Sequence, residues 1–185
     1  MHNQSKDFAD TALDQIIQEF GQQPFYILIS CLLSLRTRDI TTIQVSRQLF
    51  HAIKTPAELA AMPLHELEAI LHPLGFYKKK AIIVKFVSQE LIDKFDNAVP
   101  NTEKELLSIN GVGLKTAHAV LSYAFNKPAL CVDTHVHRIS NRLGWTSTQT
   151  AEQTHHNLMR IIYQKNWNEI NHVLVKWGQN ICTPV

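Results

Sequence analysis

A glycine turn between two apolar helical segments places the tightest constraint on the fold of this chain. Residues 106–109 and 114–125 carry apolar side chains at helical spacing, and a Gly-Val-Gly turn at residues 111–113 separates them. So short a connection predicts a helical hairpin. The turn places backbone amides where the second helix begins, and a helix start attracts anions through its unpaired N–H groups and its dipole. The sequence therefore predicts a hairpin that can hold a phosphate.

Helix signals also dominate the rest of the chain, and no stretch shows the apolar–polar alternation that is typical of a strand. The apolar run from Pro24 to Leu35 predicts a helix that is buried on all sides, with the proline in its first turn. Thr55 and Thr102 each stand three residues before a glutamate, which is the capping-box pattern. We therefore expect an all-α protein. The other helices are expected at residues 8–20, 64–71, 77–95, 133–143, 151–163 and 168–177.

Composition excludes several classes of protein. The chain has 185 residues and is 45% hydrophobic, enough for a core in one compact unit or in two small lobes. The longest apolar run, Ile27 to Leu35, is too short to span a bilayer. The first seven residues, Met1 to Asp7, are polar and do not resemble a signal peptide. We therefore expect a cytoplasmic protein of the bacterial type, associated with the nucleoid.

The overall charge does not point to nucleic acid, because 18 basic and 16 acidic residues leave a net charge of only +2. A DNA-binding function must then depend on local clusters, such as Lys78 to Lys80 and the pair Arg36 and Arg38. For such charge runs the ordinary alternative is a solvated helix face. Three cysteines, an odd number, argue against a disulfide framework.

The segment from the glycine turn to Val132-Asp133-Thr134-His135 resembles the endonuclease III family of helix-hairpin-helix DNA glycosylases. Lys115 follows the turn at the position where the family has a lysine nucleophile, and Asp133 falls on the family's aspartate. The resemblance extends along nearly the whole chain. Further matching segments are Pro24 to Asp39, Leu74-Gly75-Phe76-Tyr77, Lys80-Ala81, Trp177-Gly178 and Cys182.

This resemblance implies a two-lobed all-α fold with a DNA cleft between the lobes. Residues 17–127 would form a central lobe that contains the hairpin at about 104–125. Residues 1–16 and 128–185 would form the second lobe. The implied partner is double-stranded DNA with damaged bases or abasic sites, bound by a monomer and without a membrane.

The implied activity is that of a DNA glycosylase and abasic-site lyase, which removes oxidised pyrimidines in base excision repair. Lys115 would form a Schiff base with the sugar, and β-elimination would follow. Asp133 would stabilise positive charge on the sugar or help to deprotonate the amine. The implied DNA-binding residues are Gly111, Val112, Gly113 and Lys78, together with Arg36 and Phe76, which would fill the gap left by a flipped base.

Several of these residues have a simpler alternative. Lys115 alone would be a surface lysine, Asp133 a helix cap, and Phe76 a core aromatic. The family often has glutamine where this chain has Arg36, so its preference for the opposite base is open. His135 and His137 lie on different faces of a helix and are not expected to share a metal. His155 and His156 are expected at the surface.

Cys182 matches the first iron–sulfur ligand of the family. A 4Fe-4S cluster needs four thiolates, and Cys31 and Cys131 have the character of small core residues. The sequence stops three residues after Cys182 (185 − 182). We therefore expect no cluster within this chain, a truncation inside the cluster loop, and a 4Fe-4S cluster in a longer natural form.

Two other functions remain open at this point. The chain could be a mismatch or adenine DNA glycosylase of the same superfamily, although Lys115 and the absence of an added C-terminal domain count against the adenine branch. It could also be a DNA-binding remnant without catalytic activity. Activity on damaged duplex separates the remnant from the enzymes.

Overall fold

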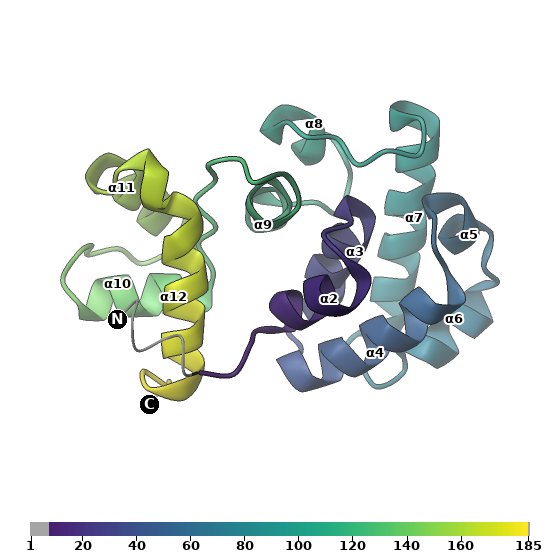
Figure 1. Ribbon diagram of the computed structural model, residues 1–185, viewed down its shortest axis with the longest axis horizontal. Coiled ribbons are helices and arrows are strands. Elements are labelled where there is room, and N and C mark those ends of the chain that lie inside the picture. Colours follow the sequence, from purple (N-terminus) through teal and green to yellow (C-terminus); the bar gives the residue numbers. More distant parts are fainter. Residues whose placement is uncertain (1–7, 185) are drawn as a thin grey trace.

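The computed structural model describes residues 8–184 and is helical throughout (Figure 1). The N-terminal segment from Met1 to Asp7 and the final Val185, on which two expectations depend, lie outside these residues. No strand occurs in the described part, so the expected all-α class is confirmed. The helices are α2 (Ala12–Phe20), α3 (Pro24–Ser34), α4 (Asp39–Ala52), α5 (Pro56–Ala61), α6 (Leu64–Leu71), α7 (Tyr77–Phe95), α8 (Glu103–Leu107), α9 (Leu114–Phe125), α10 (Thr134–Arg142), α11 (Ala151–Ile161), the 3-10 turn η1 (Gln164–Asn166) and α12 (Trp167–Asn180).

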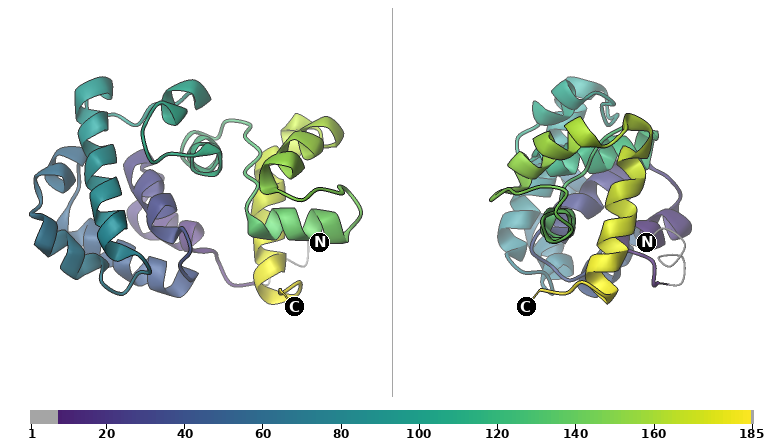
Figure 2. Two further views of the ribbon diagram at one scale, coloured as in Figure 1. Left: turned by 180° about the vertical axis from the view of Figure 1, so that it is seen from behind. Right: turned by 90° about the vertical axis from the view of Figure 1, so that its left-hand side faces the viewer.

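Residues 8–184 form two hydrophobic cores, which correspond to the two lobes in Figures 1 and 2. The larger core is built on α3, whose residues from Phe25 to Leu33 are all buried. This helix contacts α2, α4, α7 and α9, which explains why its sequence is apolar on every side. The smaller core joins α10, α11 and α12 through Leu130, Val136, Leu158 and Leu174.

The N-terminal helix differs from its expected place. Thr11 caps α2, and Asp14 completes the capping box, so the helix begins at Ala12 instead of Phe8. Its apolar face, with Ile16 fully buried, packs against α3 and α4 in the larger lobe. The lobe boundary expected at residue 16 therefore falls inside a helix.

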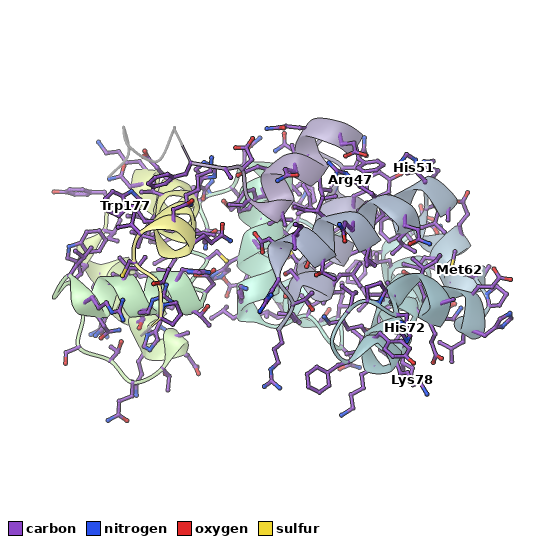
Figure 3. The ribbon with its side chains drawn as sticks, turned by 90° about the horizontal axis from the view of Figure 1, so that it is seen from below. Arg47, His51, Met62, His72, Lys78 and Trp177 are labelled. Carbon is purple, nitrogen blue, oxygen red and sulfur yellow. The ribbon has the colours of Figure 1, made fainter. Side chains whose placement is uncertain are left out.

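Residues 8–11 form the segment that crosses to the smaller lobe. The Phe8 ring meets the Trp177 ring edge-on at 6.1 Å, and Asp10 forms an ion pair with Lys176 at 3.0 Å. Figure 3 shows Trp177 on the smaller lobe, far from His72 and Lys78 on the larger one. Within residues 8–184 no helix has both the length and the apolar character needed to cross a bilayer.

Candidate active site between the two lobes

The hairpin predicted from the glycine turn is formed by α8 and α9. Thr102 caps α8 by accepting from the Glu105 amide, as the capping pattern predicted. Glu90 on α7 accepts from the Asn110 amide at 2.7 Å and forms an ion pair with Lys94. This hydrogen bond connects the long helix α7 to the turn. The hairpin is therefore anchored in the larger lobe.

The three residues of the turn have different roles. Gly111 has a φ of +97°, and a Cβ there would lie 3.0 Å from the Ile83 side chain, so the fold itself requires glycine. The Val112 amide donates to Ile109 O at 3.0 Å and is not available to an anion, although Val112 is among the expected DNA-binding residues. Gly113 has an ordinary φ of −94°, and a Cβ there would meet nothing within 4 Å.

The space next to Gly113, the N-cap of α9, is open, so packing within the protein does not require glycine there and the predicted close approach by DNA fits this position. We expect Gly113→Ala to weaken binding to damaged and undamaged duplex alike, by roughly 2- to 10-fold, the value of one lost hydrogen bond. Fluorescence anisotropy with both duplexes measures this. Gly111→Ala is the matched control and should instead lower the free energy of unfolding by about 1–3 kcal/mol. Lost lesion discrimination with unchanged affinity in Gly113→Ala would contradict the phosphate-binding role.

Lys115 and Asp133 line the same cleft between the lobes, with a volume of about 640 Å³. Its walls come from the α3–α4 connection, from α9, from residues 131–135 and from α12. The Lys115 side chain is exposed at the second position of α9. The structure thus brings together the amine and the carboxylate, which are 18 residues apart in the sequence (133 − 115).

Asp133 is the N-cap of α10, as its simpler alternative predicted. Its Oδ1 accepts from the amides of His135 and Val136, both at 2.9 Å. In the part of the chain that the structure describes, the second oxygen, Oδ2, has no hydrogen-bond partner. The cap therefore fixes the carboxylate at the cleft and leaves one oxygen available for chemistry.

Two contacts connect the segment of Lys115 to the segment of Asp133. The Cys131 thiol donates to Lys115 O at 3.5 Å, and the His118 ring bonds Leu130 O through Nδ1 at 3.0 Å. His118 lies three residues after Lys115, and Leu130 lies three before Asp133. The relative position of the amine and the carboxylate is thus set by contacts close to both.

Arg36 and Phe76 lie next to each other, the first in the loop between α3 and α4 and the second in the loop between α6 and α7. Both have a left-handed backbone, with φ of 54° and 58°. The Arg36 guanidinium lies 6.0 Å from the centroid of the Phe76 ring. Phe76 is 60% exposed, so the alternative that it is a core aromatic is wrong. Bulky residues rarely adopt this backbone conformation, and such strain is concentrated at functional sites.

The comparisons with known proteins agree with this geometry. A model of the "HhH-GPD superfamily base excision DNA repair protein" matches residues 29–164. Endonuclease III of Thermotoga maritima is 45% identical over 161 residues, which cover 87% of this chain and 76% of that protein. The chain belongs to the endonuclease III family. Endonuclease III of Bacillus subtilis is 36% identical over 163 residues, covering 86% of this chain and 73% of that one. A solved structure of a trapped endonuclease III–DNA covalent intermediate has a TM-score of 0.84 at 35% identity, covering 94% of this chain and 85% of the other.

As a member of the endonuclease III family, the chain is a DNA glycosylase and abasic-site lyase of base excision repair. Its partner is DNA that contains damaged bases. The expected family, fold class and enzyme class are confirmed. The roles of the individual site residues remain predictions, since family membership does not test them one by one.

The lysine cluster at residues 78–80 divides in two. Lys78 and Lys79 are exposed, and Figure 3 shows Lys78 at the edge of the larger lobe. Lys80 is only 6% exposed and cannot reach a phosphate. Burial lowers the pKa of its ammonium to about 8. The burial of Lys80 could not be predicted from the charge pattern, because three consecutive lysines of a helix look alike until their neighbours are known.

His155 was expected at the surface, and this prediction is wrong. Its ring is buried against that of His118, with centroids 4.8 Å apart. Both rings place Nδ1 at 3.0 Å from Leu130 O, a carbonyl whose two lone pairs can accept both. His118 also contacts Glu103 through Nε2 at 2.7 Å. Of the adjacent residues His155 and His156, the second is exposed as expected.

The buried ring makes stability depend on pH. Burial, reinforced by the neighbouring His118, lowers the pKa of His155 below its ordinary 6.5. The unfolded chain then binds this proton more readily than the folded protein, so stability present above pH 6.5 is lost as the pH falls through the folded-state pKa. Urea unfolding at pH 7.5 and 5.5 should show a smaller loss for His155→Asn than for the wild type. The exposed control His156→Asn should lose as much as the wild type; equal losses in all three proteins would contradict the assignment.

Neither His135 nor His137 belongs to a metal site among the described residues, where no three metal-ligating side chains come together. His137 bonds Thr154 through Nδ1 at 2.6 Å. His135 packs on α12 at Gly178, where a Cβ would lie 2.2 Å from its ring. This close approach explains the Trp-Gly motif at the start of the last helical turn.

Proposed function

We propose that the chain removes oxidised pyrimidines from duplex DNA, with Lys115 as the nucleophile, and then cuts the strand by β-elimination. The observation that carries this proposal is the exposed Lys115 amine in a cleft that Asp133 also lines. The cleft opens between the hairpin and the smaller lobe, where a flipped nucleotide has access to both groups. Lysine is suited to this chemistry, since a primary amine forms a Schiff base with a sugar carbon.

The proposed reaction passes through a covalent intermediate between Lys115 and the sugar. The unprotonated Nζ of Lys115 attacks C1′, the bond from C1′ to the base breaks, and the base leaves with the electron pair and takes up a proton. The C1′–O4′ bond then breaks and O4′ takes up a proton, which leaves a protonated imine between Lys115 and C1′. Loss of a C2′ proton then expels the 3′ phosphate, and water releases Lys115. The Asp133 carboxylate would stabilise the positive charge that builds on the sugar as the base departs.

A duplex with a single thymine glycol tests the substrate class. We expect strand cleavage at the lesion and none in the undamaged duplex. Cleavage only of mismatched or adenine-containing sites would instead favour the other glycosylase branches. Binding to the damaged duplex without cleavage, also at a preformed abasic site, would favour the non-catalytic remnant.

Arg36 and Phe76 are proposed to fill the gap left by the flipped base. Phe76→Ala and Arg36→Ala should each slow the processing of a paired lesion by about 10-fold or more, and that of an abasic site much less. The reason is that an abasic site has no base to extrude, so a residue that replaces the base matters less. Single-turnover rates on the two substrates measure the difference. Equal losses would reduce Phe76 to a packing residue and Arg36 to a phosphate contact.

Lys78 and the turn residues Gly111, Val112 and Gly113 remain proposed DNA contacts, with Val112 acting through its shape because its amide is occupied.

Location at the nucleoid is proposed on the ground that the substrate is DNA.

For the iron–sulfur cluster, the described residues do not provide the ligands. Cys31 and Cys131 are buried in the larger core, where burial raises the pKa of both thiols, that of Cys31 to about 12. Only Cys182 is accessible, and its sulfur accepts from Arg142 at 3.0 Å. We propose that the 185-residue chain retains no 4Fe-4S cluster. Stoichiometric iron, with loss of colour on mutation of Cys182, would overturn this.

A further inference from the structure

Lys80 is a buried cation that the proposed chemistry does not use. Lysine is almost never this buried without partners, because removing an ammonium from water is costly. Its Nζ donates to Leu33 O at 2.8 Å and to Thr37 Oγ1 at 2.6 Å. Both acceptors belong to the end of α3 and the loop after it, so the cation connects α7 to that loop.

The two acceptors fix the loop that carries Arg36. Leu33 O is one of the last carbonyls of α3, which have no partner within the helix. Thr37 follows Arg36 directly, and its amide donates to Ser34 O at 3.0 Å. Lys80 thus binds the chain on both sides of Arg36, whose left-handed backbone must be held by its neighbours.

The same residue also fixes the loop that carries Phe76. The Lys80 amide donates to Phe76 O at 3.0 Å and forms the first turn of α7. Lys80 therefore contacts Phe76 through its main-chain amide, and its ammonium binds the chain on either side of Arg36. Lys80 thus connects the two loops. This explains how the exposed side chains of Arg36 and Phe76, both on a left-handed backbone, keep a fixed position relative to each other.

We propose that Lys80 is a positioning residue for base extrusion, which holds Arg36 and Phe76 in register so that both enter the duplex together. This inference rests on the proposed gap-filling role of these two side chains. A residue with only a structural role would affect every substrate through the amount of folded protein. A positioning residue instead affects the substrates whose base must be extruded and leaves the chemistry at Lys115 intact.

The test compares Lys80→Met with Lys85→Met, a matched control on the same helix. Lys85 Nζ also donates to two carbonyls, Ala60 O and Met62 O, but these cap α5 and lie outside the two loops. We expect Lys80→Met to slow single-turnover processing of a thymine glycol duplex by about 10- to 100-fold, a typical cost of misplacement. β-elimination at a preformed abasic site should stay within about threefold of the wild type. Lys85→Met should change both rates equally or not at all.

Thr37→Val provides a second variant in case Lys80→Met does not fold. It removes the side-chain acceptor and should give a smaller loss, again confined to the paired lesion. The double variant should lose less than the product of the two single losses, since both remove the same contact. Equal losses of Lys80→Met or Thr37→Val on both substrates, or a substrate difference in Lys85→Met as well, would overturn the inference. A wild type that cleaves neither substrate would instead contradict the proposed function itself.

Discussion

Lys115→Ala is expected to abolish covalent trapping on DNA. With borohydride and a duplex that contains an oxidised pyrimidine or an abasic site, the wild type should form a stable protein–DNA adduct by reduction of the imine. The alanine variant should form at least roughly 10³-fold less, because Lys115 is the only lysine among the described residues that line the cleft. DNA affinity should fall little, since the phosphate contacts remain. Denaturing gels measure the adduct, and anisotropy measures the affinity.

Lys104→Ala is the matched control for this experiment. Lys104 is an exposed lysine of α8 in the same hairpin, but it does not line the cleft. It should be trapped as efficiently as the wild type. Full trapping of Lys115→Ala would assign the chemistry to another amine.

Asp133→Asn should slow base release by about 100-fold or more while affinity changes only a few-fold. In the proposed role the charge of the carboxylate acts on the transition state, so its removal should affect the rate more than binding. Asparagine has nearly the same shape, and its side-chain oxygen can still accept from the His135 and Val136 amides. Single-turnover kinetics on the damaged duplex measure the effect.

Thermal unfolding separates the capping role of Asp133 from its proposed catalytic role. Asparagine is as good an N-cap as aspartate, and only the interaction of the charge with the helix dipole is lost, worth about 0.3–1 kcal/mol. The melting temperature should therefore change by no more than a few degrees. An unchanged rate of base release would leave Asp133 as a cap alone.

Features with local signals could be predicted from the sequence. The apolar run of α3, the caps at Thr55, Thr102 and Asp133, and the hairpin around the glycine turn all appear in the structure. Each depends on residues within a few positions of one another, so propensity and capping chemistry suffice. The pairing of Lys115 with Asp133 at one cleft came instead from the family resemblance.

Features that depend on tertiary neighbours could not be predicted. Helix α4 was missed because Arg38 supplies no side-chain cap and the helix contains β-branched residues such as Thr41, Thr42 and Val45. Lys80 and His155 are buried beside hydrogen-bond acceptors that are far away in the sequence. Leu33 O is 47 residues from Lys80, and Leu130 O is 25 residues from His155. Nothing in the adjacent residues distinguishes these two side chains from exposed ones.

The carbonyl of Leu130 also affects how this family member tolerates sequence change. It accepts one ring from α9 and one from α11, although α11 has the polar sequence of a surface helix. The segment that leads to Asp133 is therefore held from two sides, by one ring of α9 and one ring of α11. A substitution at His155 would remove one of these two contacts, so we expect α11 to tolerate fewer substitutions than its polar sequence indicates.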